Sequence, residues 1–375
     1  MEGERAGRPT GSVLHHFATL KDPRIERTKR HDLLDIIVIA LCGIICGADS
    51  WVEIAEFGQA KEAWLKQVLT LPHGIPSHDT FGRVFALLDP VAFHQCFLNW
   101  IHAVQQATHG DIVAIDGKTL RRSFDHASGQ HPLHLVSAWA CKNRLVLGQM
   151  KTADHSNEIT AIPHLLQLLD LAGCTVTIDA LGTQKQIARA ITTADADYVL
   201  ALKGNHETAF DEVRTFLDDW ATTHPASQTT EKDHGRVEIR RAWLSGEIAW
   251  FQDKPVWPGL TSVGMVEAQR HIKSQIQTQR RSDLSSLPAQ DVPRFADAVR
   301  AHWNIENALH WTLDVCFGED QSRVRQQHAP ENLAILRRMA LNLLKRETSR
   351  KGGVKVRRLR AACDTTYLAQ ILLQI

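Results

Sequence analysis

The sequence lacks the usual short metal-binding motifs. Its seven cysteines are scattered without a CxxC pair, and its 20 histidines include no HExxH pair. These absences argue against a zinc site of the common spacings. An odd number of scattered cysteines is typical of reduced thiols in a cytosolic protein.

Long hydrophobic runs are missing as well. The longest one, residues 36–48, is too short to cross a bilayer, and residues 1–12 are polar and charged, unlike a secretory signal. We therefore expect a cytoplasmic protein with no membrane partner, in which residues 1–12 form a disordered tail.

A net charge of one sign is also lacking, because 43 Lys and Arg balance 42 Asp and Glu. The total charge therefore gives no indication of a nucleic-acid partner. The distribution is uneven, however, since residues 337–360 contain ten Lys or Arg and a single acid, Glu347. This basic run is compatible with a solvated surface and with a phosphate-binding surface.

The first part of the chain has helical patterns throughout. With 375 residues, 43% of them hydrophobic, the chain is long enough for two or three domains. Asp32 precedes a strongly apolar helix, and helical spacing continues on both sides of a turn-forming segment at 72–79. We predict that residues 13–105 form an all-helical N-terminal domain.

Residues 110–346 predict an α/β domain. Strand-like segments at 111–115, 133–141 and 145–152 are followed by helices that alternate with two further strands, at 174–178 and 198–202. This is the element order of a ribonuclease H-like fold.

Two aspartates follow strands of this predicted sheet. Asp116 comes after the first strand and Asp179 after the fourth. If these strands are neighbours, their carboxyl ends would bring the two carboxylates together.

A β-rich insertion is predicted at about residues 224–288, ahead of a helix over 291–317. The insertion contains several aromatic residues, which mostly serve packing. A peripheral β-extension and a DNA-contacting platform both fit this segment.

The predicted helix over 291–317 contains an acid between two histidines. Glu306 lies four residues after His302 and four before His310, so the three side chains share a face of the helix. We expect Trp303 and Trp311 to be core residues.

Three converging carboxylates cannot all stay ionised without a cation, because like charges repel at such distances. Two divalent ions held by carboxylates can activate a water or hydroxyl on one side of a phosphate and stabilise the leaving oxygen on the other. Magnesium suits oxygen ligands best. From spacing alone this is a weak signal, since aspartate is also common in turns.

The chain resembles DDE transposases of bacterial insertion sequences, and most closely the ISAs-type, H-repeat-associated group. Four segments in order carry this resemblance: IVAIDGKTLRRS (112–123), TIDALGTQKQIA (177–188), LALKGNH (200–206) and HWNIENALHWTLDVCFGEDQSRVR (302–325). The N-terminal segments LLDIIVIALCGIICGADSW and HGIPSHDTFGRVF extend it to nearly the whole chain.

Carried over residue by residue, the resemblance implies that Asp116, Asp179 and Glu306 are the catalytic, metal-binding triad. The implied cofactor is two Mg²⁺ ions, for which Mn²⁺ can substitute. The neighbouring residues that we expect to contact DNA are Lys118, Arg121, Arg122, Lys203, His302, Arg323 and Arg325. An ordinary surface charge, or a core histidine for His302, is the alternative for each.

The chain departs from the family pattern at two places. Ser282 and Asp283 stand where the group usually has tyrosines. The wider superfamily also places a tyrosine and an arginine before the catalytic glutamate and a lysine after it, where this chain has Val299, His302 and Leu313. The second departure leaves open whether strand ends pass through a hairpin.

The resemblance implies a DNA transposase that cleaves DNA at the terminal inverted repeats of its insertion sequence and joins the freed 3′ end to target DNA. Its partners would be these double-stranded DNAs and other copies of the chain, in a homodimer or larger synaptic assembly, associated with the bacterial nucleoid. A ribonuclease H-like nuclease or resolvase and a non-catalytic DNA-binding repressor are the alternatives. We predict that residues 13–105 contribute most of the sequence readout and that the basic run at 337–360 mainly contacts phosphates, while residues 347–375 form a basic C-terminal segment.

Overall fold

The computed structural model describes residues 13–104, 110–124, 129, 131–152, 158–233, 236–272 and 275–373, so the predicted tail at 1–12 lies outside it. The helices are α1 (Val13–Phe17), α2 (Leu33–Ile45), α3 (Trp51–Ala60), α4 (Glu62–Leu65), α5 (His78–Leu87), α6 (Pro90–Val104), α7 (Glu158–Gln167), α8 (Lys185–Thr193), α9 (Glu207–Thr223), α10 (Val292–Asn304), α11 (Trp311–Phe317), α12 (Ala329–Arg346), α13 (Val354–Cys363) and α14 (Thr365–Leu373). The strands are β1 (Ile112–Thr119), β2 (His134–Ala140), β3 (Leu145–Lys151), β4 (Thr175–Ile178), β5 (Asp197–Leu202), β6 (Ser227–Asp233), β7 (Arg236–Ser245), β8 (Ser262–Ile272) and β9 (Gln275–Ser285).

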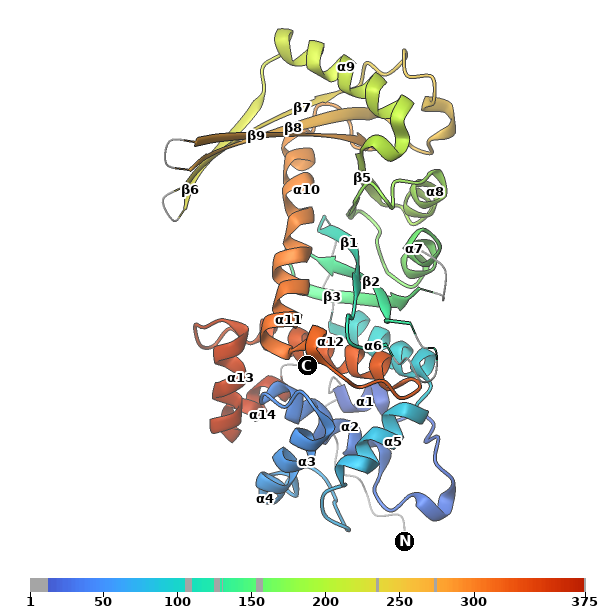
Figure 1. Ribbon diagram of the computed structural model, residues 1–375, viewed down its shortest axis with the longest axis vertical. Helices are drawn as coiled ribbons and strands as arrows, with labels where there is room; N and C mark the ends of the chain where they lie inside the picture. The colour runs from blue at the N-terminus through green and yellow to red at the C-terminus, as the bar shows by residue number, and fades with distance from the viewer. Residues whose placement is uncertain are drawn as a thin grey trace.

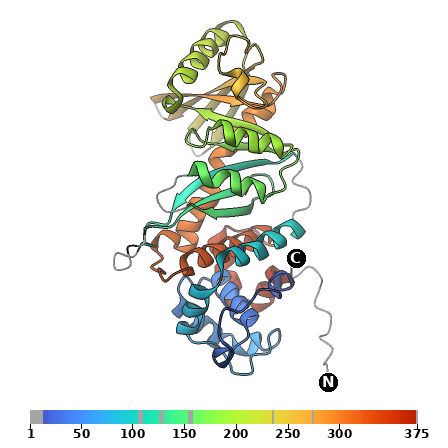
Figure 2. The ribbon, with the colours of Figure 1, turned by 90° about the vertical axis from the view of Figure 1, so that its right-hand side faces the viewer.

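The N-terminal helices begin at side-chain caps. Asp32 accepts a hydrogen bond from the backbone of Leu34 ahead of α2, and Ser50 and Glu53 form a reciprocal capping box at α3. Helix α2 is buried almost all round because α12, from the other end of the chain, packs against it and against α5 and α6. The first and last helices therefore form one helical body at one end of the molecule (Figures 1 and 2).

The strands form a single nine-stranded sheet in the order β3-β2-β1-β4-β5-β9-β8-β7-β6. Strands β1, β4 and β5 are parallel, and all other neighbours are antiparallel. The first and fourth strands are thus neighbours, as the element order suggested. Strand β1 runs to Thr119, further than the predicted segment 111–115, so Asp116 lies within the strand rather than after it.

The insertion continues this same sheet. Strand β9 pairs with β5, and the long strands β6 to β9 project sideways from the body (Figure 1). Strand-like patterns at 237–244 and 261–268 predict β7 and β8, whereas no pattern predicts β6 or β9. Helix α9 contacts β8 and β9, while α10 contacts β7 and β8 from the opposite face.

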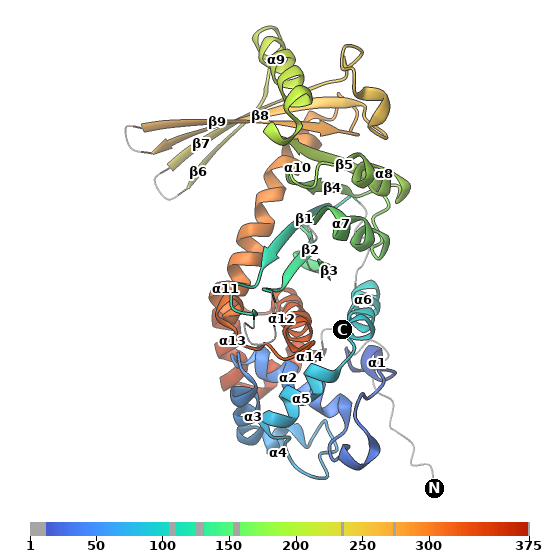
Figure 3. The same ribbon diagram turned by 45° about the vertical axis from the view of Figure 1, so that its right-hand side comes forward.

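Helix α10 crosses the strands of the sheet, from β1 to β7, on the face opposite α7 and α8 (Figure 3). Its Phe295 is fully buried against Gly264 of β8, where an added Cβ would lie 2.4 Å from the ring. Arg294 donates a hydrogen bond of 2.8 Å to Thr175 of β4. These contacts fix the helix over the strands that carry the two aspartates.

The helix predicted over 291–317 contains a π-helical turn, Ile305–His310, between α10 and α11. The expectation that Trp303 and Trp311 are core residues is wrong, because their side chains are 45% and 59% exposed. His302 takes the buried position on α10, and Trp303 follows about 100° further around the helix axis.

Within the described residues, no single helix is long and apolar enough to cross a membrane. Helices α5 and α6 reach that length only together, as a pair bent by 92°.

Candidate active site

Three acids from distant parts of the sequence line one cleft of about 190 Å³. Asp116 comes from β1, Asp179 from the turn after β4, and Glu306 from the π-helical turn. The two aspartates converge because β1 and β4 are parallel neighbours, and Glu306 reaches them because α10 crosses the same strands. The cleft therefore gathers all three acids of the sequence prediction.

Each oxygen of Asp116 has a distinct surrounding. Its Oδ1 accepts a hydrogen bond from the backbone N–H of Gly117 at 2.9 Å. Its Oδ2 lies 3.3 Å from Nε2 of His310, whose ring is buried. One oxygen is thus held by the strand itself, and the other faces the π-helical turn.

Asp179 is fixed by the turn that follows β4. Its Oδ1 accepts hydrogen bonds from the backbone N–H groups of Leu181 and Gly182, at 3.1 and 3.2 Å. Burial raises the pKa of Asp179, and the negative charges of Glu158 and Asp116 raise it further against the opposing hydrogen bond from Gly182. This carboxylate is in surroundings that favour either a proton or a nearby cation.

Glu306 differs from the aspartates in being exposed. It lies in the π-helical turn, a type of distortion found frequently at functional sites. His302, one α-helical turn earlier, is buried, and its Nδ1 lies 3.2 Å from Oγ1 of Thr177. Burial, followed by the positive charge of Arg281, lowers the pKa of His302 to about 4, so this histidine is neutral at neutral pH.

Basic and polar side chains complete the lining of the cleft. Lys203 and His302 are there, as the sequence suggested, together with Gln279, Arg280 and Arg281 of β9. The sequence analysis missed the β9 residues because it did not predict β9. The two adjacent arginines, Arg280 and Arg281, were the sequence feature that could have indicated a phosphate-binding position here.

Asp283 supports one of these arginines. It is fully buried, and its Oδ1 accepts a hydrogen bond of 2.9 Å from Nε of Arg281. This aspartate occupies one of the positions at which the sequence departs from the family pattern. The departure thus places a carboxylate directly behind a residue that lines the cleft.

Five of the expected DNA-contacting residues lie outside the acid cleft. The ammonium of Lys118 forms an ion pair with Asp314 and lies 3.2 Å from Glu319 and 3.8 Å from Asp320. Arg121 is largely exposed, with its Nε 3.4 Å from Asp320. The charge of Lys118 is therefore already balanced by carboxylates of the same chain.

A second cleft, of about 910 Å³, contains the two arginines of the segment 302–325 that resembles the family. Arg323 and Arg325 line it together with Arg83 of α5. Arg325 also donates a hydrogen bond of 3.0 Å to the backbone carbonyl of Arg122. This cleft lies between the N-terminal helices and the segment after α11.

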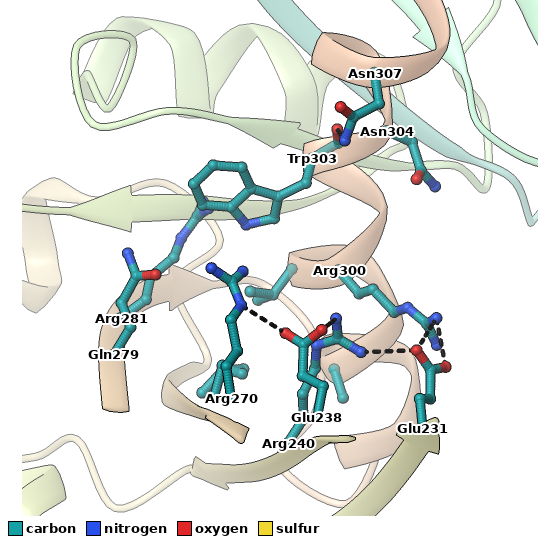
Figure 4. A pocket seen from close by; sticks show the side chains of 14 residues that line it. Glu231, Glu238, Arg240, Arg270, Gln279, Arg281, Arg300, Trp303, Asn304 and Asn307 are labelled. Carbon is teal, nitrogen blue, oxygen red and sulfur yellow. Dashed lines mark hydrogen bonds and ion pairs between the residues drawn. The ribbon is translucent and has the colours of Figure 1, made fainter. Parts of the chain in front are cut away.

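A groove of about 460 Å³ adjoins the acid cleft and shares Gln279, Arg281 and Trp303 with it. Figure 4 shows the indole of Trp303 extending across this groove from α10. The charged residues of the lining are four arginines and two glutamates: Arg240, Arg270, Arg281, Arg300, Glu231 and Glu238. The two glutamates are paired with arginines and Arg281 is paired with Asp283, so four arginines against three carboxylates leave one positive charge in excess beside the acids.

The basic run at 337–360 does not form one exposed surface. Arg337, Arg338 and Arg358 are buried, at 1%, 0% and 5% exposure. Arg338 pairs with Glu319 at 2.9 Å, and Arg358 pairs with Asp49 at 2.8 Å. Because these three arginines are buried, the expectation that the basic run mainly contacts phosphates is wrong for them. They stabilise the helical body instead.

The acid cleft offers the type of ligand that a divalent cation such as Mg²⁺ prefers, because its acids are carboxylates whose negative charges repel one another. Across the described ranges, however, no three His, Cys, Asp or Glu side chains lie close enough together to hold a metal ion. The acids thus share a cleft without forming a closed metal site.

Comparison with known proteins identifies two families along the chain. Residues 107–343 match the family described as Transposase DDE domain, and residues 14–101 match the family described as DDE_Tnp_1-associated. DDE transposase domains generally use divalent metal ions. The first match contains β1, β4 and the π-helical turn, and therefore all three acids.

Several curated proteins are similar to this chain. A Xanthobacter autotrophicus protein named "Uncharacterized protein in dhlA 3′ region" is 49% identical over 279 residues, covering 73% of this chain and 94% of its own length. "Putative transposase YncI" of Escherichia coli O157:H7 is 40% identical over 370 residues, covering 96% of this chain and 94% of its own. "H repeat-associated putative transposase YhhI" of Escherichia coli K12 is 36% identical, covering 96% and 97%.

Among solved structures, the chain is similar to a piggyBac transposase in a synaptic complex with hairpin DNA. The TM-score is 0.40 at 11% identity, and the match covers 96% of this chain and 77% of the other.

Proposed function

Since the chain belongs to the Transposase DDE domain family, we propose that it is a DNA transposase that cleaves DNA at the terminal inverted repeats of its insertion sequence and transfers the freed strand to target DNA. The observation that carries this proposal is the convergence of Asp116, Asp179 and Glu306 in one cleft. Their places, on neighbouring parallel strands and a crossing helix, support a ribonuclease H-like core.

In this proposal the three carboxylates hold two Mg²⁺ ions, for which Mn²⁺ can substitute. The ions would supply activation of a water or a 3′ hydroxyl and stabilisation of the leaving oxygen. Backbone N–H groups hold both aspartates for this role, that of Gly117 within β1 for Asp116 and those of Leu181 and Gly182 in the turn after β4 for Asp179. Glu306 is exposed and comes from the π-helical turn that follows α10.

The cations of the cleft have a separate role. Lys203 and Arg281 line the cleft beside the three acids. The hydrogen bond from Arg281 to Asp283 fixes the direction of the Arg281 guanidinium. We assign them to the phosphate that lies between the acids, because positive groups beside a scissile phosphate stabilise the charge that develops there. His302 is neutral and hydrogen-bonded to Thr177, so we assign it to positioning α10.

The proposed DNA path continues from the acid cleft into the groove of Figure 4. The two share residues, and the groove retains a positive lining after its own ion pairs are counted. Two ends of an element have to be held together during transposition, so we propose a homodimer or larger assembly on DNA.

The test is cleavage of a labelled duplex that carries the end of the element, with Mg²⁺ present. Glu306→Gln should lower the cleavage rate at least about a hundredfold while DNA binding, measured by gel mobility shift, is retained. Asp170→Asn, which changes an exposed acid ahead of β4 and thus at the other end of this strand from Asp179, is the matched control and should cleave like the wild type.

The products separate transposition from simple nuclease activity. A transposase should also join the cleaved 3′ end to a second, unlabelled duplex, and a nuclease should not. Binding by both proteins with cleavage by neither, in Mg²⁺ and in Mn²⁺, would contradict the proposal in favour of a non-catalytic DNA-binding protein.

A further inference from the structure

The segment between β5 and α9 ends one of the motifs that resemble the family, LALKGNH at 200–206, and its last two residues have no part in the proposed mechanism. Both donate hydrogen bonds to backbone carbonyls of the turn after β4. Nδ2 of Asn205 is 2.7 Å from the carbonyl oxygen of Ala180, and Nε2 of His206 is 2.6 Å from that of Thr183. A carbonyl oxygen only accepts hydrogen bonds, so Nε2 of His206 carries a proton.

This turn carries Asp179 beyond the end of the β-ladder. The last paired residues of β4 and β5 are Ile178 and Leu200, so the ladder stops one residue before the aspartate. The hydrogen bonds from Leu181 and Gly182 to Oδ1 of Asp179 are internal to the turn. They fix the carboxylate within the turn, but they do not fix the turn within the cleft.

Side chains attach the turn to the neighbouring strand. The buried hydroxyl of Thr183 donates a hydrogen bond of 2.6 Å to the carbonyl of Ala201 on β5. Asn205 and His206 attach the turn to the residues just after β5. The His206 ring in turn packs edge-on against the buried indole of Trp257, with 6.0 Å between the ring centroids. These three hydrogen bonds therefore set the place of the turn relative to β5.

We propose that Asn205 and His206 are positioning residues, which hold the turn after β4 against the end of β5 and thereby place the carboxylate of Asp179 in the acid cleft. The inference rests on the proposed function, because it concerns the reaction that Asp179 would serve. Asn205 is exposed and His206 half-buried, so neither side chain mainly fills the core. Lys203, from the same short segment, lines the cleft itself.

A purely local role is the simplest alternative for these two hydrogen bonds, since loop side chains often bond to the backbone within a few residues. The acceptors here lie 25 and 23 residues earlier in the chain. A turn released from them would move the Asp179 carboxylate, and a displacement of about 1 Å can lower a catalytic rate about a hundredfold. A positioning role therefore predicts a lower cleavage rate on bound DNA, with DNA affinity retained.

The test compares His206→Leu, which has no donor, with His206→Gln, whose amide nitrogen can take the place of Nε2. The cleavage rate of a labelled duplex carrying the element's end is measured with Mg²⁺ on fully bound DNA. We expect His206→Leu to lower this rate about tenfold or more with DNA affinity within about twofold of the wild type, and His206→Gln to restore most of the rate. His164→Leu, at an exposed histidine of α7 outside the cleft, is the matched control and should cleave like the wild type.

A second readout needs neither DNA nor metal. Asn205→Leu removes the other donor at an exposed position. Hydrogen exchange of the backbone amides of residues 179–183, followed by mass spectrometry, should be about tenfold or more faster in both leucine variants than in the wild type and in His206→Gln. Thermal unfolding curves close to that of the wild type would show that the variants are folded.

The outcomes separate this inference from the proposed function. Equal cleavage rates in the wild type and in both leucine variants would overturn the inference and leave the proposed function intact. So would a loss of DNA affinity at an unchanged rate on bound DNA, an equal loss of rate in His206→Gln and His206→Leu, or unchanged hydrogen exchange across 179–183. A wild type that cuts no DNA, with faster exchange in both leucine variants, would contradict the proposed function and support the attachment of the turn.

Discussion

Removing the charge of Glu319 should destabilise the protein in a pH-dependent way. The Glu319 side chain is fully buried, and its carboxylate accepts a hydrogen bond of 2.9 Å from Arg338 and lies 3.2 Å from the ammonium of Lys118. Burial alone would raise its pKa, but the positive charges of Arg338 and then Lys118 lower the pKa from 4.5 to about 2.

The magnitude follows from this difference between the folded and unfolded states. A pKa lowered from 4.5 to about 2 corresponds to about 3 kcal/mol of stability at neutral pH, at about 1.4 kcal/mol per pKa unit. Because the folded pKa is the lower one, this stabilisation is complete above the unfolded value of 4.5 and is lost as the pH falls towards 2. Removing one partner of a buried ion pair costs about 3–5 kcal/mol, which agrees with this value.

The assay is urea unfolding of the wild type and of Glu319→Gln between about pH 7 and pH 3. The free energy of unfolding should differ by about 3 kcal/mol at pH 7, and the difference should shrink below about pH 4.5. Asp320→Asn is the matched control, because its carboxylate is 3.8 Å from Lys118 and partly exposed; it should cost less than about 1 kcal/mol. A difference that stays constant with pH would contradict a lowered pKa of Glu319 in the folded protein.

Two further predictions concern the exposed basic residues and a close packing contact. Replacing Arg350, Lys351 and Lys355, which are exposed members of the basic run, by glutamine should lower the slope of log affinity against log salt by about 2.7 if each contacts a phosphate. DNA-binding titrations at several salt concentrations measure this, and a lost sequence preference with an unchanged slope would contradict it. Gly264→Ala should cost about 1–3 kcal/mol in urea unfolding, because its Cβ would lie 2.4 Å from a buried aromatic ring. Gly204→Ala, with no neighbour within 4 Å, should change stability by less than about 0.5 kcal/mol, and equal effects of the two would argue against overpacking.

The convergence of the acids was predicted from the element order together with the family resemblance, since the spacing of the acids alone was a weak signal. The alternation of strands and helices indicated that Asp116 and Asp179 follow neighbouring parallel strands, and β1 and β4 do pair in parallel. The spacing around Glu306 indicated a helix, and α10 provides it up to Asn304. The roles of these acids in catalysis remain predictions.

Other features depend on contacts that no local pattern reveals. The π-helical turn and the exposure of Trp303 follow from how α10 packs over the sheet, whereas helical spacing alone places a tryptophan in the core. Strand β9 is defined by its pairing with β8 along its length and with β5 at its end. Its sequence does not alternate between buried and exposed residues, because six consecutive residues from Gln275 are exposed. Glu158 has the sequence signal of any acid at the start of a helix, and only the fold places it beside Gly117.

The basic residues near the acids differ in how readily they can bind DNA. A phosphate that approached Lys118 would compete with Asp314, Glu319 and Asp320, which already surround its ammonium in a partly buried position. Lys203 lines the acid cleft itself. Because an ion pair formed by the fold has to be broken before a buried cation can bind a new anion, Lys118 should serve mainly to fix the end of β1. Lys203 should then contribute more than Lys118 to the salt dependence of DNA binding, although both lie in motifs that resemble the same family.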